Sequence, residues 1–220
     1  MIFENSQDQF DIDLSNNIKK IGIKLSGGAD SSIVCYMLAK YAKEERPDIT
    51  IYPITGISLA KPYQEIFAKR VIDKIEGLLD YKFGEHIAES VRNDHYIVDQ
   101  TKIVEKAYNK LNLDMHFAGI TANPEPDDAP ELFLDPTALP SDDRSKKQIK
   151  RPQTTPSSST WYPLINVDKK GVKEHYERLG VLDTLFPITR SCEDITTDFS
   201  SHCGKCWFCL ERKWGFGRLV

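Results

Sequence analysis

Two adjacent glycines, an acid and three serines follow a short apolar stretch near the start of the sequence, in the run LSGGADSS that begins at Leu25. Glycines let a backbone turn sharply and bring its N–H groups against a ligand without obstruction, and hydroxyls add further donors. A helix that begins near Asp30 directs its unpaired N–H groups and the positive end of its dipole into the same space. The pattern therefore predicts a phosphate-binding loop, with candidate nucleotide-binding residues Ser26, Gly27, Gly28, Asp30, Ser31 and Ser32.

This loop lacks the spacing of two other nucleotide-binding patterns. A Walker A loop needs Lys followed by Ser or Thr after its second glycine, and a Rossmann fingerprint needs a third glycine. The run instead resembles the SGGxDS signature of the PP-loop ATP pyrophosphatases, the adenine nucleotide alpha hydrolase-like superfamily, which split ATP between its α- and β-phosphates. The resemblance implies that the loop holds pyrophosphate and that adenine lies near Ile54 and Gly56, at the end of the second strand. An ordinary turn with a helix N-cap is the alternative.

Within the loop, Asp30 and Ser31 are the candidate catalytic residues. The Asp30 carboxylate has two possible roles, to hold Mg²⁺ or to cap the helix, and the sequence does not separate them. The resemblance implies that the Ser31 hydroxyl stabilises charge that grows on the leaving pyrophosphate. Cys35, four residues after Ser31 among apolar neighbours, is expected to be a buried thiol in the core.

Four of the five cysteines gather in the last 29 residues. Four thiolates at such spacings can close a tetrahedron around Zn²⁺, and a closed set of soft ligands leaves no position for a catalytic water. The sequence therefore predicts a structural zinc, with an iron–sulfur cluster or unligated core cysteines as alternatives. His202 could replace one thiolate, but beside Cys203 it is expected to be exposed. The candidate ligands are Cys192, Cys203, Cys206 and Cys209.

The C-terminal half carries a second, narrower resemblance, to the 7-cyano-7-deazaguanine synthases within the PP-loop enzymes. Its segments appear in the family's order: PLINVDKKGV, then LG, then TRSC, then HCGKCWFCLER. The central segments differ, because GISLAKPYQE and FAGITANPEP stand where the family has Tyr-Gly-Gln and Gly-Arg-Asn. The matching positions are Pro163, Leu164, Lys169, Leu179, Gly180, Thr189, Ser191, Cys192, Cys203, Gly204, Cys206, Cys209 and Arg212.

This resemblance implies a complete reaction. A carboxylate on a 7-deazaguanine attacks the α-phosphate of ATP and releases pyrophosphate, ammonia converts the acyl-adenylate to an amide, and a second adenylation dehydrates the amide to a nitrile. Lys169 is a third candidate catalytic residue, as a phosphate contact beside Mg²⁺, and the family precedent is a homodimer. Two other functions stay open: a PP-loop enzyme with another acceptor such as a tRNA base, and a non-catalytic, zinc-stabilised nucleotide-binding protein.

The overall composition is that of an ordinary globular protein of 220 residues with 40% hydrophobic residues. With 33 acidic and 29 basic residues, its formal charge of −4 gives no sign of nucleic-acid or membrane binding, although it does not exclude local basic patches. No apolar run approaches the length of a membrane helix, and the N-terminus lacks the pattern of a signal peptide. We therefore expect a cytoplasmic protein.

Apolar runs of strand length alternate with segments of helical period along the chain, which is typical of an α/β fold. Strands are expected at 20–25, 49–57, 81–88 and 115–120, and helices at 31–43, 62–79, 98–111 and, between an Asp168 N-cap and Gly180, at 168–180. The predicted fold is Rossmann-like, a parallel sheet with helices on both faces, plus a small C-terminal zinc-binding segment.

The expected organisation is a nucleotide-binding domain over 1–190 and a zinc-binding segment with four cysteines over 191–220. Within the first lies a segment rich in Pro, Ser and Asp, 122–160, which shows little periodicity. Segments of this length are lids or linkers. Its basic stretch, 144–151, either touches an anionic substrate or forms a solvated face.

Overall fold

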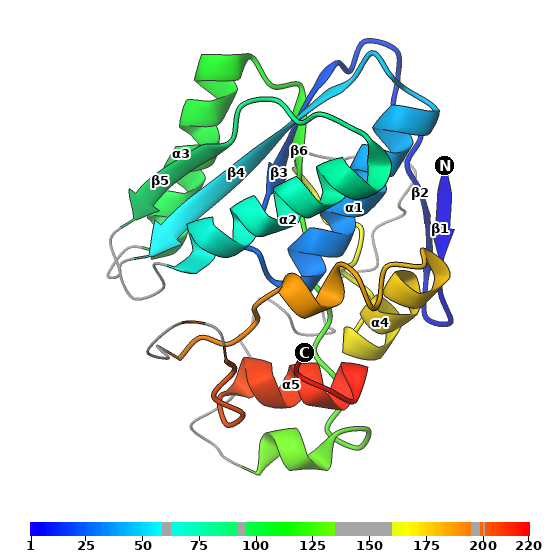
Figure 1. Ribbon diagram of the computed structural model, residues 1–220, viewed down its shortest axis with the longest axis vertical. Helices are drawn as coiled ribbons and strands as arrows, with labels where there is room; N and C mark the ends of the chain where they lie inside the picture. Colours follow the sequence, from blue (N-terminus) through cyan, green and yellow to red (C-terminus); the bar gives the residue numbers. More distant parts are fainter. Residues whose placement is uncertain (59–62, 92–95, 135–159, 195–198, 200) are drawn as a thin grey trace.

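The computed structural model describes residues 1–58, 63–91, 96–134, 160–194, 199 and 201–220 (Figure 1). Its centre is a five-stranded sheet in which each strand runs parallel to its neighbours. The strand order is β5-β4-β3-β6-β7. The strands are β3 (Lys20–Lys24), β4 (Thr50–Ser58), β5 (Ile87–Val91), β6 (Met115–Ala118) and β7 (Thr160–Trp161).

Helices cover both faces of this sheet, as the alternation of apolar runs predicts. Helices α1 (Ala29–Glu44) and α2 (Tyr63–Leu79) pack in the larger core with Ile21 and Ile23 of β3. On the opposite face, Ile103 and Val104 of α3 (Tyr96–Leu111) pack against Ile54 of β4. Successive residues of a strand point to opposite faces, so β4 supplies both cores, with Ile51 in the larger one and Ile54 in the smaller one.

The strand order places a crevice at the centre of the sheet. After β3 the chain proceeds to β4 and β5 on one side, and it then returns to place β6 and β7 on the other side of β3. In open parallel sheets, ligands bind beyond the carboxyl ends of the strands at such a reversal. The run LSGGADSS leaves β3 at this position, between β4 and β6.

The C-terminal part of the chain packs beside this crevice. Helix α4 (Lys169–Arg178) packs against α1 and against α5 (Trp207–Phe216), and a 3-10 turn (Phe186–Ile188) lies between α4 and α5 in the sequence. Gly215 allows α5 to approach α4 closely, since a Cβ at this position would lie 2.2 Å from the Cβ of Lys169. A second 3-10 turn (Pro130–Phe133) packs on α5 through Trp207.

At the other end of the chain, the first residues form a hairpin that sequence analysis does not identify. Strands β1 (Ile2–Glu4) and β2 (Gln9–Asp11) pair in antiparallel fashion, and Phe3 stacks on Phe10 with ring centroids 5.6 Å apart. The hairpin lies beside α4, where the Asn5 amide donates to the carbonyl of Gly171. Within the described ranges, no helix has the length and apolarity needed to cross a membrane.

Most of the expected elements are confirmed, but the strand expected at 81–88 is wrong, because β5 begins at Ile87. Tyr81 and Phe83 pack edge to face against each other and against the larger core, and the Tyr81 hydroxyl accepts from the N–H of Ile51. The apolar alternation at Tyr81 and Phe83 therefore belongs to the segment between α2 and β5, which covers the core. Asp168 caps α4 through the N–H groups of Lys170 and Gly171, as expected. In the segment expected to be a loop, 122–160, the structure describes only 122–134 and the first residue of β7.

Candidate functional site

A network of hydroxyl hydrogen bonds shapes the loop after β3. The Ser31 hydroxyl lies 3.2 Å from that of Ser26 and accepts from the N–H of Ser26 at 3.3 Å. The Ser26 hydroxyl in turn accepts from the N–H of Gly28 at 3.3 Å. Helix α1 begins directly after Gly28, two residues earlier than expected, so its first N–H groups lie beside these hydroxyls. The Gly28 carbonyl accepts from the hydroxyls of both Ser31 and Ser32, at 3.2 Å and 2.7 Å, and Ser32 is fully buried.

Gly27 fixes the path of this loop. Its φ is +78°, and a Cβ there would lie 2.4 Å from the Cβ of Phe67 in α2. Its carbonyl accepts from the N–H of Arg190 at 2.9 Å. Gly27 therefore holds the loop between α2 and the C-terminal part of the chain, in a conformation and a space that other residues do not fit.

We expect Gly27→Ala to destabilise the protein and distort the loop. A left-handed backbone costs a non-glycine residue roughly 1–3 kcal/mol, and the clash with Phe67 adds to this cost. Gly217→Ala is the matched control, because Gly217 has φ +75° but no heavy atom within 4 Å of its Cβ position. Chemical denaturation of both variants measures the difference. Equal losses of stability would show that the contact with Phe67 does not constrain the loop.

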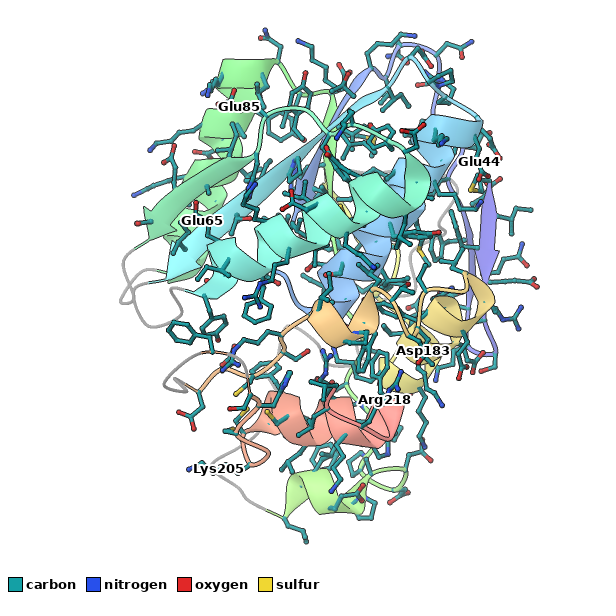
Figure 2. The ribbon with its side chains drawn as sticks, in the orientation of Figure 1. Glu44, Glu65, Glu85, Asp183, Lys205 and Arg218 are labelled. Atoms are coloured by element: carbon teal, nitrogen blue, oxygen red, sulfur yellow. The ribbon has the colours of Figure 1, made fainter. Side chains whose placement is uncertain are left out.

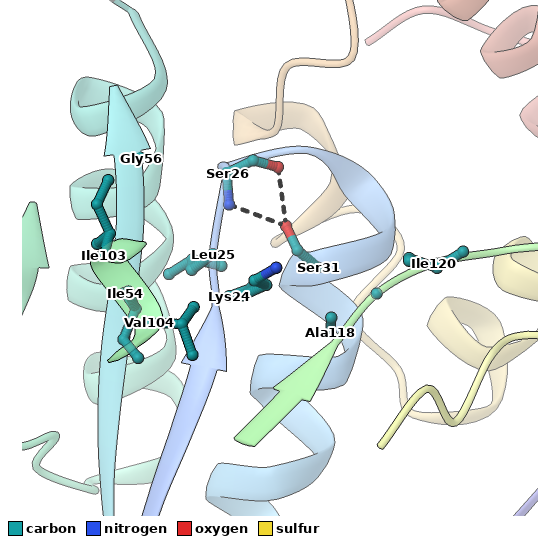
Figure 3. A pocket seen from close by; sticks show the side chains of 11 residues that line it. Lys24, Leu25, Ser26, Ser31, Ile54, Gly56, Ile103, Val104, Ala118 and Ile120 are labelled. Carbon is teal, nitrogen blue, oxygen red and sulfur yellow. Dashed lines mark hydrogen bonds between the residues drawn. The ribbon is translucent and has the colours of Figure 1, made fainter. Parts of the chain in front are cut away.

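Two adjoining cavities open at the crevice. The first lies beyond the ends of β3, β4 and β6 and is largely apolar, with Lys24, Leu25, Ile54, Gly56, Ile103, Val104, Ala118 and Ile120 in its lining (Figure 3). The second lies over the start of α1 and is more polar, with Gly28, Ala29, Asp30, Tyr63, Gln64, Lys169, Arg190, Ser191, Cys192, Glu193 and Phe208 in its lining. Ser26, Ser31 and Gly119 line both cavities. The two spaces therefore meet at the hydroxyl pair of the loop.

A buried ion-pair network crosses the second cavity. The Lys169 ammonium donates to the Asp30 carboxylate, and it lies 3.6 Å from the carboxylate of Glu211. Lys169 is 3% exposed and Glu211 is fully buried, whereas Asp30 is 22% exposed and lines the cavity. The carboxylate of Glu211 in α5 thus stabilises the Lys169 ammonium from the protein interior. The charge of Lys169 lies in the cavity beside the start of α1.

The four cysteines expected to hold metal come together. The Sγ atoms of Cys192, Cys203, Cys206 and Cys209 all lie within 4.8 Å of one another. Sulfurs at about 2.3 Å from one tetrahedral zinc ion are about 3.8 Å apart, and the Cys203 and Cys209 sulfurs are 3.8 Å apart. The set therefore fits a single ion. An iron–sulfur cluster also takes four cysteine thiolates.

The surroundings of the cysteines are partly exposed. Cys192 and Cys209 are buried, whereas Lys205, in the turn between Cys203 and Cys206, projects outward (Figure 2). The expectation that His202 is exposed is wrong. This side chain is half-buried, because its Nε2 packs against the segment before Cys192 and accepts from the N–H of Ser191 at 3.4 Å.

The metal-binding segment is joined directly to the phosphate loop. Cys192 lines the second cavity, and its carbonyl accepts from the Tyr63 hydroxyl at 2.7 Å. Arg190, two residues earlier, holds the Gly27 carbonyl through its N–H, and its guanidinium lies 4.6 Å from the centroid of the Tyr63 ring. An ion at the cysteines would therefore order one wall of the cavity.

Arg212 ties the same segment to α5. It is fully buried, and its guanidinium donates to the hydroxyls of Thr189 and Ser191 and to the carbonyls of Phe186 and Leu219. The guanidinium also lies 3.8 Å from the centroid of the Phe186 ring. The Thr, Ser and Arg positions of the C-terminal motif thus form one hydrogen-bonded unit, which has a structural role.

The structure brings most of the candidate site residues to one place. Ser26, Ser31, Ile54 and Gly56 line the first cavity, and Gly28, Asp30 and Lys169 line the second. Gly27 and Ser32 support the loop from outside both linings. Sequence reasoning missed several residues of the cavities and of the ion-pair network. Of these, only Gly119 has a feature that the sequence shows, a glycine near the end of an expected strand. The missed residues are Lys24, Tyr63, Gly119, Arg190 and Glu211.

Comparison with known proteins finds likeness in structure but none in sequence. No protein-family model matches the chain, and no curated protein matches it in sequence. Among solved structures, the chain is similar to the U34-tRNA thiolase NcsA from Methanococcus maripaludis with its 4Fe–4S cluster, with 18% identity and a TM-score of 0.45 over 93% of this chain and 72% of that chain. At this level the likeness assigns neither a family nor an activity to the chain.

Proposed function

We propose that this protein is an ATP-dependent enzyme of the PP-loop type, which transfers the adenylyl group of ATP to an acceptor oxygen and releases pyrophosphate. The observation that carries the proposal is the pair of cavities that meet at Ser26 and Ser31. An apolar space suits adenine, and a polar space with a helix start and a lysine suits two phosphates. The bond between the α- and β-phosphates then lies where the cavities meet.

In the proposed reaction, an acceptor oxygen attacks the α-phosphorus while the bond to the bridging oxygen of the β-phosphate breaks. The electron pair of that bond leaves with pyrophosphate, where negative charge grows. The hydroxyls of Ser26 and Ser31, the first N–H groups of α1 and the Lys169 ammonium are positioned to stabilise this charge. Because these groups are held by the fold before ATP binds, they need little rearrangement during the reaction.

Asp30 is the proposed magnesium ligand. The sequence leaves two roles open for it, to hold Mg²⁺ or to cap the helix, and we propose the first. Helix α1 has Gly28 at its N-cap, and no side chain caps it. The Oδ1 atom of Asp30 is buried and has no hydrogen-bond partner among the described residues. A free carboxylate oxygen beside a phosphate site suits Mg²⁺, which neutralises phosphate charge when bound.

A 7-deazaguanine carboxylate, with ammonia as the second nucleophile, is the proposed acceptor system. The support is the resemblance of the C-terminal motif. Its Lys169 pairs with Asp30 and Glu211 and lines the second cavity together with Ser191, and its Arg212 donates to Thr189 and Ser191. Zinc is the proposed ion at the cysteines, because a compact set of four thiolates suits one tetrahedral ion and leaves no open coordination position.

Turnover of ATP tests this function. The assay measures AMP, pyrophosphate, ADP and phosphate with 7-carboxy-7-deazaguanine plus ammonia, with unmodified tRNA, and without acceptor. We expect AMP and pyrophosphate in equal amounts, dependent on the 7-deazaguanine. Turnover with tRNA alone would retain the adenylation but reject this acceptor, whereas ADP release, or ATP binding without turnover under any condition, would contradict the proposal.

A variant of the loop sharpens the same assay. We expect Ser31→Ala to lower the rate of pyrophosphate release by roughly 10²-fold, because one preorganised donor to the leaving group is lost. Ser15→Ala is the control, since the hydroxyl of the exposed Ser15 bonds only to Asn17 in the described structure and lies outside both cavities. A Ser31→Ala rate equal to that of the control would remove Ser31 from the mechanism.

A further inference from the structure

Lys24 is a cation in the first cavity that the proposed mechanism does not use. It is the last residue of β3, and its neighbours in register are Ile54 on β4 and Ala118 on β6. Both neighbours line the same cavity, as do Ile103 and Val104 of α3. The side chain of Lys24 thus leaves the central strand of the sheet among apolar groups.

The position of Lys24 follows from the alternation of the strand. Ile21 and Ile23 point into the larger core, and Gly22 and Lys24 face the side that α3 covers. Figure 3 shows the ammonium group of Lys24 directed toward the hydrogen-bonded pair Ser26 and Ser31. The aliphatic stem therefore lies against the sheet while the charge faces the meeting point of the cavities.

This charge has no countercharge in the described part of the chain. No hydrogen bond or ion pair joins the Lys24 ammonium group to another described residue, and burial lowers the pKa of this group below the ordinary value. Lys24 is half-buried, and removing a cation from water is unfavourable unless an anion accompanies it. The cavity therefore favours a ligand that brings negative charge to this position.

Each cavity has its own positively charged side chains. Lys169 and Arg190 line the second cavity only, and Lys24 lines the first only. If pyrophosphate occupies the second cavity, the phosphate nearest to Lys24 is the one attached to the nucleoside.

We propose that Lys24 binds the α-phosphate of the nucleotide and remains with AMP after pyrophosphate has left, so that the first cavity is an AMP site in its own right. This inference rests on the proposed function. Lys24 would stabilise the charge of the α-phosphate during attack, and it would make the enzyme prefer AMP to adenosine.

Titration calorimetry of the whole protein with AMP, adenosine and pyrophosphate tests this inference. We expect Lys24→Met to weaken AMP binding by roughly 10- to 100-fold and to leave adenosine binding within about twofold, because only the charged contact is lost. Lys169→Met should do the opposite, losing pyrophosphate and keeping AMP. Lys20→Met is the matched control, since Lys20 lies on the same strand face and donates to the carbonyl of Leu111, outside the cavity.

Adenosine binding also reports whether the cavity is intact. If Lys24→Met does not fold, Lys24→Gln provides the same comparison with a polar, neutral side chain. Unchanged AMP affinity in the variant, or equal losses for AMP and adenosine, would overturn the role of Lys24 and leave the proposed function standing. Wild-type protein that binds neither ATP nor AMP would overturn both.

Discussion

Lys169→Met should abolish pyrophosphate release and lower the free energy of unfolding by about 3–5 kcal/mol. The lysine is 3% exposed and lies between the carboxylates of Asp30 and Glu211. Removing it leaves the fully buried Glu211 without this cation. Loss of one partner from a buried ion pair is strongly destabilising, because the charge of the other partner stays buried. Activity falls for a separate reason, because the polar cavity loses its lysine beside the start of α1.

A double variant separates these two effects. Lys169→Met combined with Glu211→Gln also removes the buried negative charge that Lys169 faced, so we expect most of the lost stability to return while pyrophosphate release stays absent. Lys170→Met is the control, because Lys170 is exposed and lies 4.4 Å from the centroid of the Trp214 ring, on the surface. Urea denaturation and the AMP assay measure both quantities. If activity returned together with stability, Lys169 would be a structural residue only.

Cys209→Ser should release the metal and weaken nucleotide binding together. Cys209 is fully buried and its sulfur lies 3.8 Å from that of Cys203. We expect the wild-type protein to hold one zinc ion per chain, and losing one ligand should lower the metal content to near zero and the free energy of unfolding by about 3 kcal/mol or more. Nucleotide affinity should fall as well, because Cys192 and Arg190 hold Tyr63 and Gly27 at the cavity.

Elemental analysis and nucleotide titration, on this variant and on chelator-treated wild type, check these expectations. Cys35→Ala is the matched control, since Cys35 is equally buried but lies in α1 outside the cluster, so its metal content should be unchanged. Wild-type metal content in Cys209→Ser would remove Cys209 from the ligand set. Iron with acid-labile sulfide in place of zinc would reject the single-ion centre.

Sequence reasoning predicts those parts of the site whose residues lie close together in the sequence. The hydroxyls and glycines of LSGGADSS lie within eight positions, so their spacing alone indicates a phosphate loop. The three cysteines from Cys203 to Cys209 are similarly close. The parallel sheet was also predictable, because apolar runs of strand length alternate with helical periods.

The missed residues join the site through the fold. Gly119 follows β6, which lies beside β3 although more than ninety positions separate them, and a Cβ on Gly119 would lie 2.6 Å from the N of Ser31. Glu211 meets Lys169 because Gly215 lets α5 pack closely on α4. Such contacts depend on strand order and helix packing, which local patterns do not determine.

A crystal structure with Mg²⁺ and α,β-methylene-ATP, which resists cleavage between the α- and β-phosphates, tests the central claim most directly. We expect adenine in the apolar cavity beside Ile54 and Val104, the α-phosphate beside the Ser26 and Ser31 hydroxyls, and the two terminal phosphates against the start of α1 near Lys169. A nucleotide bound elsewhere, or bound here with its terminal phosphates outside the second cavity, would contradict the account.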